Sequence, residues 1–258
     1  FGTSTFLAHY ARQAHPYDFH KARVVVSGAE KLNAEVASLW LNKFGLRIME
    51  GYGATECAPV LSLNTPLCYR PGSVGRLLPG IEHRLVPLAG IARGGVLHVR
   101  GPNLMRGYYL YENPEVLQPS GSAVGEGWYN TGDVVDVDDE RFVTIHGRVK
   151  RFAKIAGEMI SLEVVEHIAY HASRDYQHAA TLELASQAGE STVLFTTDPR
   201  LDRIALQKAA RELGAQDLAV ARRVVHVATL PQLGSGKTDY VTLKTLAGDN
   251  AAGGGRRG

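Results

Sequence analysis

Two short apolar runs separated by a helical segment constrain the fold of this chain more than any other feature. ARVVVSG (22–28) and LRIMEGYG (46–53) are apolar runs that end in glycine, which is typical of strands buried on both faces of a sheet. KLNAEVASLWLNKFG (31–45), between them, has the apolar spacing of a helix and also ends in glycine. A strand, a helix and a strand within about 30 residues form a βαβ unit, so we expect a parallel pair of strands here.

The rest of the chain changes texture twice. From about residue 70 to 146, glycine and proline separate short alternating segments such as GVLHVRG, which predicts a β-rich subdomain. Beyond residue 147 helical and strand patterns alternate, and Ser161 is placed to cap a helix. We expect helices at about 4–14, 161–172, 201–213 and 240–247, and strands near 178–184, 191–197 and 222–228.

Length and composition limit the class of protein. The chain has 258 residues, and we expect an α/β protein with one domain at 1–146, a second at 147–250, and a disordered Gly-rich tail at 251–258. The formal charge of +2 is too small to indicate nucleic-acid binding, and no apolar run approaches the roughly 18 residues of a membrane span. Two cysteines, Cys57 and Cys68, fit a reducing compartment. The chain begins without methionine or a signal peptide, so we expect a piece of a longer protein.

GYGATE (51–56) is a first candidate site, at the predicted carboxyl end of a parallel strand, where open sheets bind ligands. Glycines on both sides of Tyr52 would let backbone approach a ligand closely and present the ring on a turn. Thr55 offers a hydroxyl to a phosphate oxygen, and Glu56 offers a hard carboxylate suited to Mg²⁺. The alternative is a plain strand-to-loop turn capped by the threonine.

WYNTGD (128–133) is a second candidate. It places Asp133 after Gly132, in what we expect to be a turn, where the carboxylate could accept hydrogen bonds from two ribose hydroxyls. The alternative is an Asx turn, in which an acidic or amide side chain bonds its own backbone.

GRVKRFAKIAGE (147–158) carries four cations, Arg148, Lys150, Arg151 and Lys154, among apolar residues, and it closes on Gly157. The alternation predicts two short strands around a turn with a solvated basic face. The same cations could dock an acidic partner protein, so both interpretations stay open.

LGSGKTD (233–239) follows a predicted strand and precedes a predicted helix, as a phosphate-binding loop of an NTPase would. That motif requires glycine at the position of Pro231, so we exclude it. What is left is Lys237 on a Gly-Ser-Gly loop, either free to carry its charge into a cleft or simply solvated. His167 and His171 have the spacing of zinc ligands, but Ile168 stands where the glutamate of that motif belongs.

Taken in order, six motifs resemble those of the adenylate-forming superfamily of acyl-CoA synthetases, luciferases and peptide-synthetase adenylation domains. They are SGAEKL, GYGATE, GGVLHVRGPNLMRGYY, WYNTGD, GRVKRFAKIAGE and LGSGKTD, and they cover nearly the whole chain. Within the superfamily, EGYGATECAPVLSLN, KRFAKIAGEMISLE and LGSGKTDYVTLK are most similar to the acyl–acyl-carrier-protein synthetase half of bifunctional 2-acylglycerophosphoethanolamine acyltransferases.

The resemblance implies a two-step reaction that uses ATP and Mg²⁺. A carboxylate attacks the α-phosphate of ATP to give an acyl-adenylate, and after rotation of the small domain about Lys150 a thiol takes the acyl group. Residues 1–146 would then be the carboxyl-terminal part of the large AMP-binding domain, and residues 147–250 the mobile small domain. The implied nucleotide-binding residues are Gly28, Ala29, Glu30, Tyr52, Gly53, Asp133 and Arg148. The implied catalytic residues are Lys237, Thr55 and Glu56, of which Glu56 would hold the metal. The thiol channel would be bordered by Lys154 and Gly157.

The resemblance also implies the partners. The acid would be a fatty acid and the acceptor acyl-carrier protein, with coenzyme A as the alternative acceptor and no nucleic acid. The protein would be cytoplasmic, held at the inner face of the bacterial membrane through other parts of a longer chain. The family's upstream phosphate-holding loop is absent from this sequence, so we expect the 258 residues alone to be inactive. The competing hypothesis is therefore a non-catalytic nucleotide-binding or interaction module.

Overall fold

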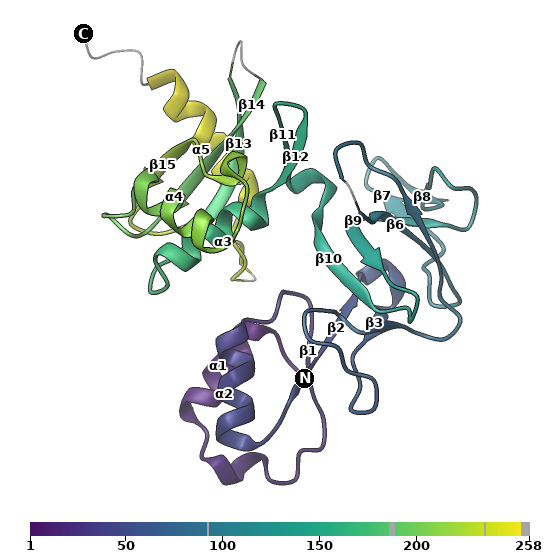
Figure 1. The fold of residues 1–258 in the computed structure, drawn as a ribbon. Helices are drawn as coiled ribbons and strands as arrows, with labels where there is room; N and C mark the ends of the chain where they lie inside the picture. The colour runs from purple at the N-terminus through teal and green to yellow at the C-terminus, as the bar shows by residue number, and fades with distance from the viewer. Residues whose placement is uncertain (92, 186–188, 235, 254–258) are drawn as a thin grey trace. The chain divides into compact units, whose positions relative to one another are not determined.

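The computed structural model describes residues 1–258 except 92, 186–188, 235 and 254–258. The chain forms two compact units, one made of Phe1–Leu88 with Arg93–His146 and the other of Ala89–Ala92 with Gly147–Gly258. Each unit combines helices with β-sheet (Figure 1), in agreement with the expected α/β class.

The first unit opens with the βαβ motif that the sequence predicts. Strand β1 pairs in parallel with β2, with Val25 opposite Ile48 and Ser27 opposite Glu50. Helix α2 lies between the two strands in sequence; the side chain of Asn33 caps its start, and Gly45 ends it with a φ of 68°. The elements are α1 (Ser4–Gln13), η1 (Pro16–Phe19), β1 (Val25–Ser27), α2 (Ala34–Phe44) and β2 (Ile48–Gly53).

Helices α1 and α2 lie side by side against β1 and β2 (Figure 1), because their apolar residues form one small core. Trp40 is buried in that core and donates from its indole nitrogen to the carbonyl of Leu7 at 2.8 Å. Beyond β2 the sheet continues antiparallel through β3 (Val60–Leu63) and β4 (Arg76–Leu77), so it is mixed, with strand order β1-β2-β3-β4.

The β-rich part of the first unit is a second sheet of order β10-β9-β6-β5 with a separate hairpin, β7-β8. A shared core that includes Leu61, Leu97 and Val135 joins it to β3 and β4. The strands are β5 (Glu82–Val86), β6 (Gly95–Arg100), β7 (Tyr108–Leu110), β8 (Asn113–Gln118), β9 (Tyr129–Val137) and β10 (Val143–Arg148). The last two residues of β10, 147 and 148, already belong to the second unit.

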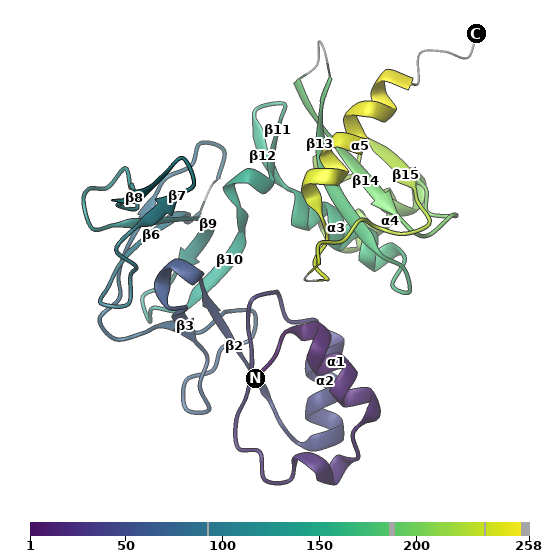
Figure 2. The same cartoon turned by 180° about the vertical axis from the view of Figure 1, so that it is seen from behind.

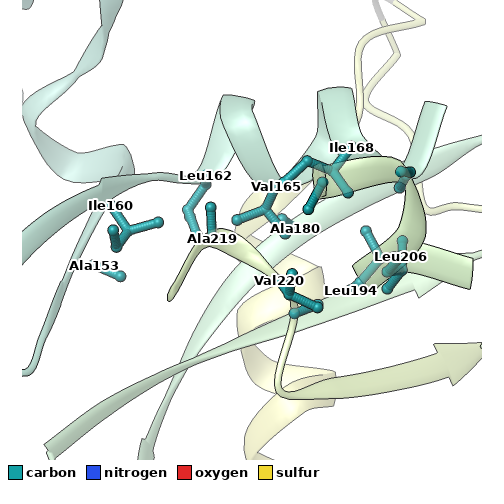
Figure 3. Packing of buried hydrophobic residues seen from close by; sticks show 14 of the residues in the cluster. Ala153, Ile160, Leu162, Val165, Ile168, Ala180, Leu194, Leu206, Ala219 and Val220 are labelled. Atoms are coloured by element: carbon teal, nitrogen blue, oxygen red, sulfur yellow. The ribbon is translucent and has the colours of Figure 1, made fainter. Parts of the chain in front are cut away.

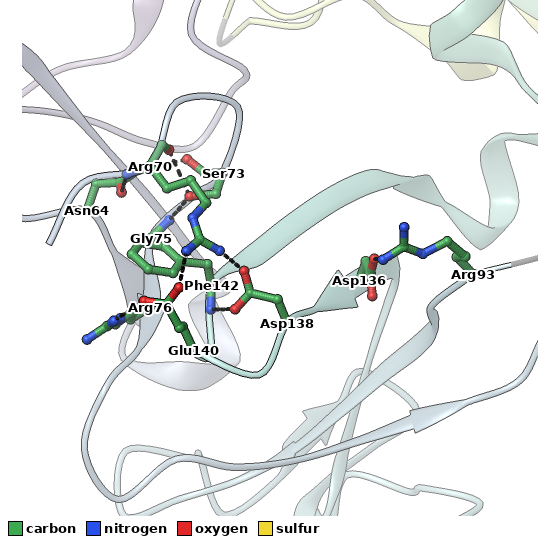
Figure 4. A network of polar contacts seen from close by, with 10 residues as sticks. All are labelled: Asn64, Arg70, Ser73, Gly75, Arg76, Arg93, Asp136, Asp138, Glu140 and Phe142. Atoms are coloured by element: carbon green, nitrogen blue, oxygen red, sulfur yellow. Dashed lines mark hydrogen bonds and ion pairs between the residues drawn. The ribbon is translucent and has the colours of Figure 1, made fainter.

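A polar network fastens the loop after β3 to the turn between β9 and β10 (Figure 4). The guanidinium of Arg70 contacts both Asp138 and Glu140, and Glu140 also accepts from Arg76 at 2.9 Å. Both guanidinium groups lie over the ring of Phe142, at 4.0 and 4.8 Å from its centroid. The cations thus cover a buried aromatic ring while their charges are matched by the carboxylates.

The second unit is a three-stranded sheet of order β13-β14-β15 with helices on both faces. Alternate residues of the strands point to opposite faces, so Ala180 and Leu194 pack with α3 and α4, whereas Phe195 packs with Leu243 of α5. Figure 3 shows the first of these cores, and Figure 2 shows α5 along the other side of the sheet. The elements are α3 (Leu162–Ala172), β13 (His178–Ala185), β14 (Gly189–Thr196), α4 (Arg203–Glu212), η4 (Asp217–Ala219), β15 (Arg223–His226) and α5 (Tyr240–Gly253).

The basic stretch at the start of this unit differs from the expected pair of strands. A 3-10 turn, η3 (Val149–Arg151), comes first, and the hairpin that follows consists of β11 (Phe152–Ile155) and β12 (Glu158–Ser161). The turn residues Ala156 and Gly157 have φ values of 51° and 90°. Two consecutive positive φ angles define the tight turn whose twist matches that of a β-hairpin. The hairpin is therefore centred on Ala156 and Gly157, and its second strand, β12, begins at the end of the basic stretch.

The last helix is longer than predicted. It runs to Gly253, so residues 251–253 are helical instead of disordered, since Ala251 and Ala252 favour helix. Residues 254–258 of the expected tail lie outside the described residues. Across the part of the chain that the structure describes, we find no helix long and apolar enough to cross a lipid bilayer.

Candidate active site

The carboxyl ends of β1 and β2 bring two of the predicted motifs together. A Cβ atom on Gly28 would lie 3.5 Å from the carbonyl oxygen of Gly51, so the loop after β1 passes close to GYGATE. Ala29 has a φ of 69°, and the carboxylate of Glu30 accepts from the backbone nitrogen of Thr5 at 2.8 Å, in the first turn of α1. These contacts fix the predicted adenine-binding loop at the strand ends.

Tyr52 and Asp133, from GYGATE and WYNTGD, are in direct contact. The hydroxyl of Tyr52 donates to a carboxylate oxygen of Asp133 at 2.5 Å, although the two residues are 81 positions apart. Asp133 is buried, at 5% exposure. The burial of Tyr52 itself, followed by the negative charge of Asp133, raises the pKa of Tyr52 well above its ordinary value of 10.0. The hydroxyl end of an aromatic side chain and a carboxylate are therefore held together.

Asp133 lies inside strand β9 and not in a turn, which corrects the sequence-based expectation. The register between β6 and β9 shifts between Val96 and His98, which marks a β-bulge. Within the bulge the backbone nitrogen of Gly132 donates to the side chain of Asn130 at 2.9 Å, and the hydroxyl of Thr131 donates to the carbonyl of Leu97 at 2.9 Å. The Asx turn therefore belongs to Asn130, and the bulge directs Asp133 toward Tyr52.

The glycines on both sides of Tyr52 allow other parts of the chain to pack closely against β2, which the sequence did not indicate. A Cβ atom on Gly53 would lie only 1.8 Å from the carbonyl oxygen of Pro59, and one on Gly51 would lie 3.0 Å from the side chain of Leu63. The register of β2 and β3 also shifts between Tyr52 and Gly53. The space where a Cβ of Gly53 would lie is thus occupied by the chain's own backbone, and the role of Gly53 in nucleotide binding stays a prediction.

Glu56 is held by a loop that sequence reasoning did not assign to the site. It lies in the short turn η2 (Thr55–Cys57), and its backbone carbonyl accepts from Met105 at 2.8 Å. Its carboxylate accepts from the hydroxyl of Tyr108 at 2.9 Å. The amide of Asn103 adds bonds to the carbonyls of Cys57, at 2.5 Å, and Val60, at 3.0 Å. Only the motif GGVLHVRGPNLMRGYY, which ends at Tyr109, hinted at the importance of this loop.

The donor atoms around Glu56 fit a magnesium ion that keeps most of its own oxygen ligands. Glu56 supplies one hard carboxylate, and the neighbouring Thr55 is exposed. Within the described residues no group of three or more His, Cys, Asp or Glu side chains is placed to hold a metal. Mg²⁺ commonly binds through one or two carboxylates together with waters and substrate phosphates, so one carboxylate here is compatible with it.

The basic stretch of the second unit contains one cation that is not solvated. Arg148, Lys150 and Lys154 are exposed, but the side chain of Arg151 is only 15% exposed and pairs with Glu166 at 2.8 Å. The predicted solvated face therefore excludes Arg151, because its charge is already matched inside the unit. Gly157, at the tip of the β11–β12 hairpin, has no atom within 4 Å of where its Cβ would be.

Lys237 is exposed on a short hairpin-like loop. Its carbonyl accepts from the backbone nitrogen of Leu233 at 2.8 Å, and Gln232 forms a β-bridge with Thr238. Asp239 then caps helix α5 by accepting from the backbone nitrogens of Val241 and Thr242. The lysine thus lies on a loop closed by the Gln232–Thr238 bridge, and the predicted Gly-Ser-Gly segment includes Ser235, which lies outside the described residues.

Comparison with known proteins agrees with this architecture. Residues 1–109 match the family described as AMP-binding enzyme. The chain is 30% identical over 196 residues to the long-chain-fatty-acid–CoA ligase of Salmonella typhimurium, covering 73% of this chain and 34% of the relative. Among solved structures it is similar to ATP-bound MatB from Rhodopseudomonas palustris, with a TM-score of 0.77, 23% identity and coverage of 96% of this chain and 50% of that one.

It is also similar to O-succinylbenzoate coenzyme A synthetase from Bacillus subtilis in complex with ATP and magnesium ion, with a TM-score of 0.75, 20% identity and coverage of 93% and 50%. Residues 1–109 belong to the AMP-binding enzyme family. The chain is a member of the adenylate-forming superfamily. The chain spans 34% of the length of the Salmonella typhimurium relative.

Proposed function

We propose that the protein is an acid–thiol ligase that activates a fatty acid with ATP and passes the acyl group to a thiol. In the first step a carboxylate oxygen of the acid bonds to the α-phosphorus of ATP, and pyrophosphate leaves. In the second step the thiol sulfur bonds to the acyl carbon, and AMP leaves. The observation that carries the proposal is the contact of Tyr52 with Asp133 at the end of a parallel strand, beside the loop of Glu56.

The first unit would bind the nucleotide. The ring of Tyr52 offers an aromatic face for adenine, with Gly28, Ala29 and Glu30 along the edge of the base. One oxygen of Asp133 accepts from Tyr52 at 2.5 Å, and its carboxylate retains acceptor capacity for ribose hydroxyls. Thr55 would donate to a phosphate oxygen, and Glu56 would hold Mg²⁺, whose charge when bound neutralises phosphate oxygens.

The second unit would supply the positive charges that change between the two steps. Lys237, on its loop, would oppose the negative charge that builds on the α-phosphate and the attacking carboxylate. Removal of one such contact lowers the rate by a factor on the order of 10²–10³. Arg148 would bond the ribose, Lys150 would be the pivot of a domain rotation, and Lys154 and Gly157 would border the incoming thiol.

The identity of the thiol is a separate part of the proposal. The name of the Salmonella relative favours coenzyme A, whereas the motifs around Lys154 and Lys237 resemble acyl-carrier-protein synthetases. Arg151 is engaged in an ion pair with Glu166, whereas Lys150 and Lys154 of the basic stretch are exposed and could contact an acidic carrier. We therefore give coenzyme A and acyl-carrier protein equal weight, in a cytoplasmic reaction.

The test uses the full-length natural protein with ATP, Mg²⁺ and a labelled long-chain fatty acid. Holo acyl-carrier protein is offered in one reaction and coenzyme A in another, each with the Lys237→Ala variant and a matched Lys208→Ala control on the exposed face of α4. Label on either thiol, reduced by a factor on the order of 10²–10³ in Lys237→Ala alone, is the expected result. AMP binding without adenylate or thioester would favour the non-catalytic module.

The same assay on the 258-residue chain tests the expectation that these residues alone are inactive. Sustained formation of acyl-adenylate by that chain would contradict it. Binding of AMP by that chain, monitored through the fluorescence of its tyrosines and tryptophans, separates nucleotide binding from catalysis.

A further inference from the structure

A buried ion pair in the second unit joins three elements at one carboxylate. An oxygen of Glu166, on α3, accepts from the guanidinium of Arg151 at 2.8 Å and from the backbone nitrogen of Ala180, on β13, at 2.8 Å. The same oxygen accepts from the hydroxyl of Tyr240, the first residue of α5, at 3.1 Å. The guanidinium of Arg151 also lies 3.7 Å from the centroid of the Tyr240 ring. We call Arg151, Glu166 and Tyr240 the clasp.

Both ends of the clasp adjoin residues with a proposed role in catalysis. Arg151 directly follows Lys150 in the turn η3, and Tyr240 follows Lys237 by three residues. The intervening Asp239 is anchored in two ways, since its backbone nitrogen donates to Pro231 at 2.9 Å and its carboxylate caps α5. These bonds tie the carboxyl-terminal end of the loop of Lys237 to the start of α5 and to Pro231.

The Arg151–Glu166 pair of the clasp is unfavourable to break because it is largely buried, whereas Tyr240 is 37% exposed. The side chains of Arg151 and Glu166 are 15% and 20% exposed. Loss of one partner of a buried pair leaves the other charge without compensation, so the arrangement tends to be either complete or lost. Partial burial, followed by the charge of Glu166, raises the pKa of Tyr240 from its ordinary value of 10.0 to about 12.

We propose that the clasp positions Lys237, by fastening the start of α5 to η3 so that Lys150 and Lys237 move as one rigid body. Arg151, Glu166 and Tyr240 are positioning residues: they touch neither substrate nor nucleotide, and they act through the loop of Lys237. This inference rests on the proposed function for the role of Lys237 itself. When the second unit rotates about Lys150, the clasp would carry the loop of Lys237 along with η3.

The most selective variant is Tyr240→Phe. It keeps the aromatic ring under the guanidinium of Arg151 and keeps the Arg151–Glu166 pair, but it removes the bond from the hydroxyl to Glu166. Tyr170→Phe, on the same helix as Glu166, is the matched control. The first measurement is hydrogen exchange in the 258-residue chain, read at the amides of Leu233 and Gly236, which close the loop of Lys237.

We expect faster exchange of those two amides in Tyr240→Phe, by roughly tenfold, with exchange in β13 and β14 unchanged. Exchange that rises equally throughout the second unit would indicate general destabilisation and would overturn the proposal. Unchanged exchange at Leu233 and Gly236 would overturn it as well, because the hydroxyl would then not restrain the loop.

The second measurement separates the two chemical steps in the full-length natural protein. Adenylate formation is followed by exchange of labelled pyrophosphate into ATP, and thioester formation by supplying ready-made acyl-adenylate with coenzyme A. Tyr240→Phe should slow the first step by roughly ten- to a hundredfold, since a small misplacement of a catalytic group has effects of that size. The second step, which does not use Lys237, should be unchanged.

Lys237→Ala, measured beside it, keeps the two proposals apart. If Lys237→Ala leaves pyrophosphate exchange intact, the proposed function of Lys237 fails. If Lys237→Ala abolishes the exchange while Tyr240→Phe has no effect, the function stands and the clasp is not a positioning device. Equal slowing of both steps by Tyr240→Phe also overturns the inference, because a purely structural role would produce it.

Discussion

The hydroxyl of Tyr52 donates a 2.5 Å hydrogen bond to the buried carboxylate of Asp133. This one bond joins the end of the mixed sheet, at β2, to the bulged strand β9 of the second sheet. It therefore orients an aromatic ring and a carboxylate with respect to each other before any ligand binds. Its strength can be tested apart from catalysis.

Tyr52→Phe should make the stability of the protein less sensitive to alkaline pH. In the native state the pKa of Tyr52 is raised by burial and by Asp133, whereas in the unfolded chain it is near 10.0. The contribution of Tyr52 to stability is thus complete below pH 10 and is lost as the pH rises above it. Above pH 10 the native state binds one proton more than the unfolded state, at Tyr52, so the free energy of unfolding falls by about 1.4 kcal/mol per pH unit. Tyr52→Phe removes this contribution to the slope.

Urea unfolding of the two proteins between pH 9 and pH 11 measures this slope, which should be steeper in the wild type than in Tyr52→Phe. Tyr109→Phe, on the exposed strand β7, controls for loss of a phenol. Parallel curves for wild type and Tyr52→Phe above pH 10 would contradict the assigned bond.

Gly53→Ala should destabilise the first unit strongly. The added Cβ would lie 1.8 Å from the carbonyl oxygen of Pro59, which belongs to backbone and cannot rotate away. We expect a loss of about 1–3 kcal/mol, the usual size for overpacking, in the free energy of unfolding. Gly121→Ala is the matched control, because no atom lies within 4 Å of its added Cβ. Equal stability of the two variants would show that the β2–β3 approach is looser than described.

Glu140→Gln should weaken the network over Phe142 in a way that depends on salt and pH. The hydrogen bond and charge of Arg70, followed by those of Arg76, hold the pKa of Glu140 below its ordinary 4.5. The stabilisation is therefore present above pH 4.5 and disappears as the pH falls below it. High salt should also remove it, since the Debye length shrinks from about 30 Å at 0.01 M to about 3 Å at 1 M.

Thermal unfolding of wild type and Glu140→Gln, at low and high salt and at pH 7 and pH 3, measures both dependences. Glu115→Gln, on the exposed strand β8, is the control for loss of a surface carboxylate. A difference between wild type and Glu140→Gln that persists at pH 3 would mean that packing, and not charge, carries the effect.

Tyr108→Phe should weaken the response to magnesium. The hydroxyl of Tyr108 donates to the carboxylate of Glu56 at 2.9 Å, and without it that carboxylate is freer to leave the position proposed for Mg²⁺. With about 1 kcal/mol at stake, we expect the magnesium concentration for half-maximal pyrophosphate exchange to rise about fivefold. Tyr109→Phe serves as the control, and an unchanged magnesium dependence would remove Tyr108 from the site.

Much of the fold was predictable because it depends on local patterns. The apolar spacing of residues 31–45, with Asn33 and Gly45 at its ends, was enough for helix α2 and for the parallel pair of strands around it. Ser161 caps α3 as expected, because a cap needs only its own helix. Glycine, in contrast, marked tight turns without revealing which atoms would fill the space beside them.

The sequence predicts residue types for the candidate site but not the contacts that those residues make. Single motifs pointed to Tyr52, Glu56, Asp133 and Lys237, since chemistry limits which side chains suit a nucleotide. No local pattern predicts that Tyr108 contacts Glu56, 52 positions away, or that Tyr240 contacts Glu166, 74 positions away. Arg151 looked like any surface cation in the sequence.

The sequence by itself determined the βαβ unit, the β-rich character of the segment after it and most helices and strands of the second unit. It also predicted which side chains would act on a nucleotide. Only the tertiary structure decided that a bulge in β9 directs Asp133 at Tyr52, and that Arg151 is buried against Glu166. The physical reason is the range of the interactions. Periodicity and capping act within a few residues, whereas polar partners in a core are chosen by how distant elements pack.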